Sequence, residues 1–141
     1  MVRYPGLLAA ALLAALTLAA GGAAAAAIPA NIAVAIDDAN RPSADKARDA
    51  DRKPGETLAF AGVKAGAQVA ELLPGGGYFT RLFSKAVGDK GHVCAVVPAP
   101  MPDAPADGPD FAKRVKAIAA EPGYGNVSVV VEPFSELKLP T

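Results

Sequence analysis

The sequence has few of the residues on which several common protein classes depend. Among its 141 residues there are one cysteine, one histidine and no tryptophan. A single cysteine excludes an intramolecular disulfide, and one cysteine with one histidine cannot supply a zinc site built from those two residue types. We therefore expect neither a disulfide framework nor a metal site.

An excess of charge of either sign is also missing, because 14 basic side chains balance 14 acidic ones. A nucleic-acid-binding surface requires clustered positive charge, so no nucleic-acid partner is expected. The length allows one ordinary domain at most, with a modest core.

The beginning of the chain resembles an export signal. The first 36 residues contain 15 alanines, and Arg3 is their only charge. Arg3 precedes an apolar stretch over residues 7–20, and residues 25–27 offer an A-x-A cleavage site. This pattern predicts a signal peptide over residues 1–27 and a periplasmic mature protein. The alternative is an uncleaved anchor in the inner membrane, because the uncharged stretch is long enough to span a bilayer.

The next segment, residues 28–53, becomes strongly charged from residue 37 onward and shows almost no apolar stripe. Ser43 is a candidate N-cap, with Asp45 in the first turn of the helix that would follow. Asp49 and Lys53 stand four residues apart with the acid first, the favourable order for a helical ion pair. We expect one helix here whose charges form a solvated face and not a binding patch.

From residue 54 onward, short apolar runs alternate with segments of helical period. Pro54 can begin a short helix that Gly62 ends. Apolar runs bounded by turn residues predict strands at residues 68–73, 92–97 and 127–131. Two amphipathic helices are expected between them, at residues 78–87 and 110–121. Their apolar faces comprise Phe79, Leu82, Phe83, Ala86 and Val87 in the first helix, and Phe111, Val115, Ile118 and Ala119 in the second.

The order strand, helix, strand, helix, strand implies right-handed crossovers and a parallel sheet. The predicted fold is therefore α/β and Rossmann-like, a parallel three-stranded half-sheet preceded by N-terminal helices. Its half-domain covers residues 54–141. Ligands bind such sheets beyond the carboxyl ends of the strands.

The segment over residues 71–77 lies at the carboxyl end of the first predicted strand and contains residues suited to ligand binding. Gly75, Gly76 and Gly77 lie between a strand and a helix, where they let the backbone approach a ligand and leave helical N–H groups free. Glu71 stands inside an apolar strand, which is costly unless its carboxylate reaches a partner or a solvent-filled crevice. A tight turn without a ligand, with Glu71 in a salt bridge, is the alternative.

The run E-L-L-P-G-G-G-Y-F-T resembles the first motif of class I S-adenosylmethionine-dependent methyltransferases. Glu71 matches the acid of that motif, Gly75 and Gly77 match its second and third glycines, and Leu73 stands where its first glycine usually is. The longer run over residues 62–88 looks like a bacterial group of predicted exported methyltransferases with a P-G-x-G-Y turn. The resemblance implies that the protein transfers a methyl group, but it identifies neither the acceptor nor the catalytic residues. It implies that S-adenosylmethionine is bound by Glu71, Pro74, Gly75, Gly76, Gly77 and Tyr78.

Two features depart from that family. Its second strand usually ends on an acid, whereas here Val97-Pro98-Ala99 stands at that point and Asp103 is the first acid beyond it. The class I sheet also usually continues with strands that hold the methyl acceptor, so we expect this chain to be the cofactor-binding half. Its first strand would then be an edge through which copies could associate. Two other functions are possible interpretations. One is an exported binding or structural module without catalysis. The other is a dinucleotide-dependent oxidoreductase, which is disfavoured because the first glycine of the motif and the acid that would bind the ribose hydroxyls are both missing.

Overall fold

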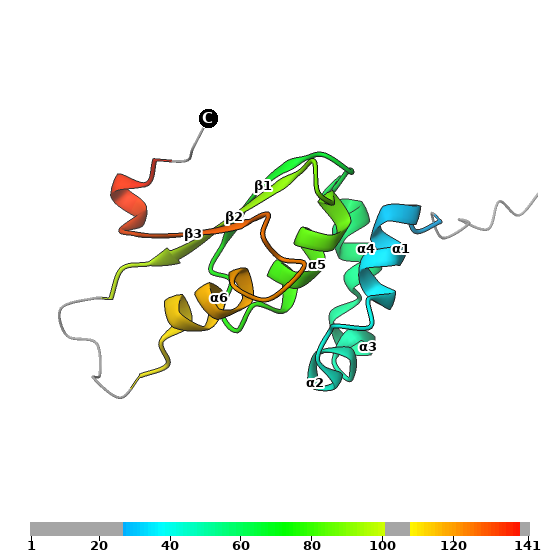
Figure 1. Cartoon of the computed structure of the whole chain (residues 1–141), viewed down its shortest axis with the longest axis horizontal. Helices are drawn as coiled ribbons and strands as arrows, with labels where there is room; N and C mark the ends of the chain where they lie inside the picture. Colours follow the sequence, from blue (N-terminus) through cyan, green and yellow to red (C-terminus); the bar gives the residue numbers. More distant parts are fainter. Residues whose placement is uncertain (1–26, 101–107, 139–141) are drawn as a thin grey trace, which may run out of the picture.

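A computed structural model of the chain describes residues 27–100 and 108–138, and these form a parallel sheet with flanking helices (Figure 1). The strands are β1 (Gln68–Leu72), β2 (His92–Pro98) and β3 (Val127–Glu132). The helices are α1 (Ala30–Asp37), α2 (Ser43–Lys46), α3 (Asp49–Arg52), α4 (Pro54–Phe60), α5 (Tyr78–Val87) and α6 (Phe111–Ala119), followed by the 3-10 helix η1 (Phe134–Glu136).

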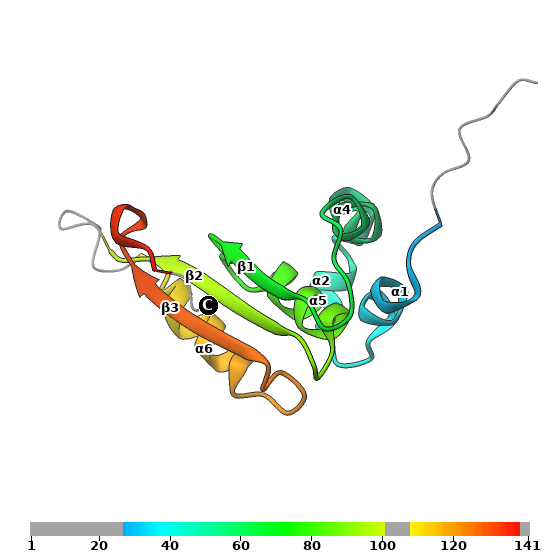
Figure 2. The ribbon, with the colours of Figure 1, turned by 90° about the horizontal axis from the view of Figure 1, so that it is seen from above.

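The three strands pair in the order β1-β2-β3, all parallel, so that β2 lies between the other two (Figure 2). The register places Ala95 of β2 beside Glu71 of β1 and Val129 of β3. Helices α5 and α6 form the two crossovers. The predicted β-α-β-α-β half-sheet is confirmed, with element ends within two residues of those expected.

The two faces of the sheet differ in what covers them. Helices α5 and α6 lie on one face, where Val93 and Ala95 pack with Leu82 and Ile118 in the core (Figure 1). Because side chains alternate along a strand, Leu72 and its same-face neighbours point the other way. Leu72 is 55% exposed, so part of this second face meets solvent.

Helix α1 is an integral part of the fold, although no local pattern in the sequence predicts a helix at residues 30–37. Ile32 and Ala35 are fully buried against the core. The Asn31 side chain donates hydrogen bonds to the carbonyls of Val63 (3.2 Å) and Ala86 (3.0 Å). These contacts fasten α1 to α5 and to the loop before β1. The predicted signal peptide falls almost entirely outside the described residues. Among the residues that are described, every helix is too short or too polar to span a bilayer.

The expectation of a single helix from Ser43 onward is wrong, although most charged side chains of this segment are exposed as expected. Two short helices, α2 and α3, form instead, and the Ser43 side chain makes no capping hydrogen bond. Asp49 does not pair with Lys53, whose backbone is left-handed with φ 45°. It pairs with Arg41, which is 3% exposed. Arg41 is buried whereas Lys53 is exposed, so Asp49 forms the tertiary ion pair with Arg41 in place of the helical pair with Lys53.

Several polar side chains of α5 are also buried, although they lie off the apolar stripe that defines its predicted inner face. Arg81 is 8% exposed and donates to both carboxylate oxygens of Glu121 just after α6. Ser84 and Asn126 hydrogen-bond to each other in the same region. The N-terminal helices and the segment after α6 therefore cover α5 on more sides than an amphipathic stripe indicates.

The burial of two aromatic residues differs from what local pattern indicates. Phe111, placed on the inner face of the second helix, is 38% exposed. Tyr124, in the loop after α6, is only 1% exposed and donates a hydrogen bond to Asp38 at 3.2 Å. Arg81 lies over its ring, which gives this buried loop residue a polar and a cationic neighbour.

Candidate functional site at the end of the first strand

The turn from β1 to α5 is built from backbone conformations that glycine favours. Gly75 (φ 58°) and Gly77 (φ 85°) are left-handed. Leu73 also has a positive φ, 61°, while its N–H still donates to Val96 and extends the ladder by one bond. A left-handed backbone costs a non-glycine residue about 1–2 kcal/mol. The turn therefore holds strain at Leu73, the position where the class I motif usually has its first glycine.

The glycines of the turn serve different purposes. A Cβ atom placed on Gly75 or Gly76 would meet no atom within 4 Å, so the space beside them is open. A Cβ on Gly77 would clash with Cδ1 of Ile118 in α6. Gly75 and Gly76 thus border an open cradle, whereas Gly77 lets α6 pack closely against the turn.

The turn beside this cradle has backbone donors without an acceptor in the described part of the protein. Within the described part of the chain, the N–H groups of Gly75, Gly76 and the first three residues of α5 donate no hydrogen bond to the protein. They sit at the positive end of the α5 dipole. The turn can therefore bind a negative or polar group through its backbone.

Glu71 is the buried acid of the site. Its side chain is 8% exposed, and its Oε2 accepts a 2.6 Å hydrogen bond from the Thr80 hydroxyl in α5. Burial raises the pKa of Glu71 from 4.5 to about 7, which the bond from Thr80 partly offsets. Over residues 27–100 and 108–138 no lysine or arginine pairs with it, so the salt-bridge alternative is not realised.

Tyr78 joins the turn to the N-terminal helices. Its hydroxyl donates a 2.6 Å hydrogen bond to Asp49, which also accepts two bonds from Arg41. Burial and the neighbouring Asp49 raise the pKa of Tyr78 to about 12. The guanidinium of Arg41 holds the pKa of Asp49 below its ordinary value. The phenol therefore stays protonated and acts as a fixed link between α3 and α5.

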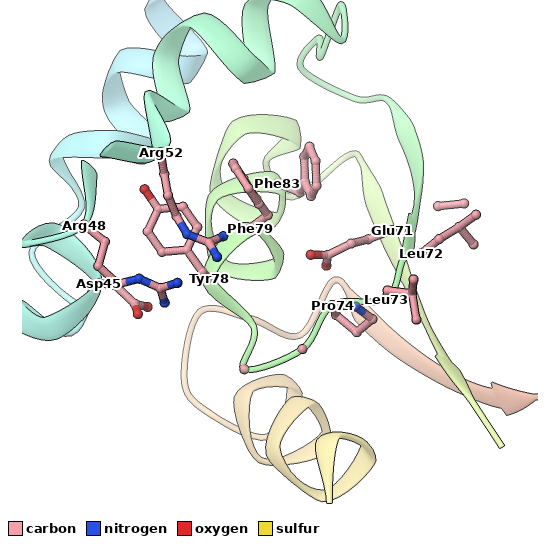
Figure 3. Close-up of a pocket in the computed structure, with 13 residues that line it drawn as sticks. Asp45, Arg48, Arg52, Glu71, Leu72, Leu73, Pro74, Tyr78, Phe79 and Phe83 are labelled. Atoms are coloured by element: carbon pink, nitrogen blue, oxygen red, sulfur yellow. The ribbon is translucent and has the colours of Figure 1, made fainter. Parts of the chain in front are cut away.

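These elements enclose a cavity of about 450 Å³ at the carboxyl end of β1 (Figure 3). It is lined by Asp45, Arg48, Arg52, Ala70, Glu71, Leu72, Leu73, Pro74, Gly75, Gly76, Tyr78, Phe79 and Phe83. Five of the six residues expected to bind a cofactor are brought together here, and Gly77 lies just behind them. Asp103, the first acid after β2, falls outside the described residues.

The sequence did not point to the far wall of this cavity. Arg48 and Arg52 come from the segment expected to be a solvated face. Arg48 is exposed and Arg52 is half-buried, and both also line the pocket. The only available signal was their spacing of four residues, which places them on one side of a helix. Phe79 and Phe83, expected on the apolar face of α5, are half-buried against the core and also line the cavity.

No family model and no curated protein matches the sequence. A solved SAM-dependent methyltransferase from Aquifex aeolicus is similar at 25% identity and a TM-score of 0.50, over 71% of this chain and 51% of that one. The fold is that of a methyltransferase half-sheet.

Two other solved structures resemble the chain. One is a protein-L-isoaspartate O-methyltransferase, with 22% identity and a TM-score of 0.46 over 69% of this chain and 27% of that one. The other is a cyclopropane-fatty-acyl-phospholipid synthase-like protein from Lactobacillus casei, with 21% identity and a TM-score of 0.49 over 72% and 38%. The chain thus spans between 27% and 51% of the length of these three proteins.

Proposed function

We propose that this chain carries the cofactor-binding part of an S-adenosylmethionine-dependent methyltransferase. The observation that carries the proposal is the buried carboxylate of Glu71 at the carboxyl end of β1. Among the described residues it pairs with no cation, and the glycine turn beside it has backbone donors that no protein group accepts. The methyltransferase half-sheet seen in the Aquifex structure supports it.

The residues present suit this cofactor. S-adenosylmethionine would supply an activated methyl group on a sulfonium cation. A positive charge near Glu71 favours its ionised form, since an opposite charge lowers the pKa of a buried acid. The open cradle at Gly75 and Gly76 lets the backbone approach a ligand that any larger side chain would displace. The contribution of this chain is binding and orientation, and the acceptor and its activating groups are not assigned.

A matched pair of glycine variants tests the proposal by calorimetric titration with S-adenosylmethionine. Gly76 borders the cavity without a positive φ, so Gly76→Val fills the cradle without straining the backbone. Gly125, in the loop before β3, is equally open and lies away from the cavity, so Gly125→Val is the control. We expect Gly76→Val alone to weaken binding at least tenfold. No binding by the folded wild-type chain, or equal binding by both variants, contradicts the proposal.

We further propose that the chain is exported and that residues 1–27 are its signal peptide. Cleavage after Ala27 would leave α1, which begins at Ala30, complete. The buried contacts of Ile32 and Ala35 require that helix in the mature fold.

A further inference from the structure

The cavity has a second charged wall, which faces Glu71. Arg48 and Arg52 bracket α3, and their guanidinium groups point into the cavity from the side opposite the Glu71 carboxylate (Figure 3). Neither arginine forms an ion pair with any acid among the residues that the structure describes. Asp45 also lines this wall without pairing with them. The cavity therefore holds two arginines and one acid on this wall, and Glu71 on the opposite wall.

Cation–π contacts hold the two arginines beside the cavity. Their guanidinium carbons lie 4.7 Å (Arg52) and 5.6 Å (Arg48) from the centre of the Tyr78 ring, which Arg41 also approaches at 5.6 Å. Arg52 also lies over Phe79, at 5.6 Å. A cation–π contact does not use up the N–H donors of a guanidinium, and their forked geometry matches a carboxylate.

The ring on which they stack is itself immobilised. The Tyr78 hydroxyl is bound to Asp49, and Asp49 is held by Arg41, whose guanidinium also donates to the carbonyl of Ile36 at 2.7 Å. This chain of bonds fixes the position of α3 relative to the glycine turn. The two arginines are thus presented by a preorganised support, which lowers the entropic cost of binding a ligand.

We propose that Arg48 and Arg52 bind the carboxylate of the donor's amino-acid end, and so select a zwitterionic ligand. The inference rests on the proposed function and extends it to the far wall of the same site. A ligand with an ammonium and a carboxylate complements a cavity with Glu71 on one wall and, on the other, two arginines that outnumber Asp45 and form no ion pair among the described residues. Alternatively, the two arginines could bind a carboxylate of the methyl acceptor. The following experiment distinguishes this case from binding of the donor's carboxylate.

Decarboxylated S-adenosylmethionine provides the test, because it keeps the sulfonium and the amine and lacks only the carboxylate. We expect calorimetry on the wild-type chain to show at least tenfold weaker binding of this analogue. Arg52→Gln and Arg48→Gln should each weaken binding of S-adenosylmethionine by about tenfold, the scale of a charge-assisted hydrogen bond. They should leave binding of the decarboxylated analogue unchanged, and Arg52→Lys should recover part of the loss.

Arg114→Gln is the matched control, since Arg114 also stacks on a phenylalanine (Phe111, 5.8 Å) but lies on α6, away from the cavity. It should change neither affinity, and circular dichroism should show all variants folded. Equal wild-type affinity for the two ligands would overturn the inference and assign the arginines to an acceptor or to structure. Equal weakening of both ligands by Arg52→Gln would overturn it as well. Failure of the folded wild-type chain to bind either ligand would instead refute the proposed function.

Discussion

Replacing Glu71 with glutamine should make the chain more stable at neutral and alkaline pH. The amide is nearly the same size and can still accept the hydrogen bond from Thr80, which is fully buried. It carries no charge, so its burial avoids the desolvation that raises the pKa of Glu71 from 4.5 to about 7.

The sign and the size of the effect follow from linkage. An acid whose pKa is raised on folding binds more protons in the folded state, so its stabilisation is complete below pH 4.5 and is lost as the pH rises through about 7. One pKa unit corresponds to about 1.4 kcal/mol, so the full difference amounts to about 3 kcal/mol. The wild-type chain should therefore lose about that much free energy of unfolding between pH 4.5 and pH 8 relative to Glu71→Gln.

Urea unfolding of both proteins across this pH range measures the difference directly. Glu56→Gln is the control, because it removes an exposed carboxylate on α4 and should leave the pH dependence unchanged. If Glu71→Gln and the wild type show parallel stability curves between pH 5 and pH 8, the carboxylate is ionised at no cost. The picture of Glu71 as a buried, cation-free acid would then be refuted.

Three further outcomes are expected. Asp49→Ala should lower the free energy of unfolding by about 3 kcal/mol in urea titrations, because it leaves the buried Arg41 unpaired, whereas the exposed Asp51→Ala should cost little; equal losses would show that the pair contributes nothing. The wild type should self-associate with rising concentration in sedimentation velocity through the β1 edge, and Leu72→Lys should keep it monomeric; a wild type that stays monomeric contradicts this. Mass spectrometry of protein expressed in a Gram-negative host should find a mature chain that begins at Ile28, and a product that retains the leader would argue for an anchor.

The elements from β1 onward were predictable because each is encoded by local pattern. The apolar runs of the strands, the helical period after Tyr78 and the glycines between them all fall within short windows of sequence. Asp110 likewise caps α6 as a local signal indicates, by accepting a hydrogen bond from the N–H of Lys113. Glu71 stood out for the same reason, as a lone acid in an apolar strand.

What could not be predicted depends on partners far apart in the chain. Helix α1 is hidden because Ile32 and Ala35 continue the alanine-rich composition of the leader, and only packing on α5 distinguishes them. The link from Arg41 through Asp49 to Tyr78 joins segments whose pairing no local spacing rule contains. That link places Arg48 and Arg52 beside the cavity, so their position could be identified only from the three-dimensional structure.

The parallel register has a consequence for the order in which the chain folds. Each strand pairing spans a complete helix and its two loops, so no part of the sheet can form as a local hairpin. The last turn of α5 depends on Asn126, whose side chain donates to the carbonyls of Ser84 and Gly88. A chain emerging during synthesis must therefore carry β2 unpaired on its β3 side until Val127 is available. Aggregation competes with folding during that interval.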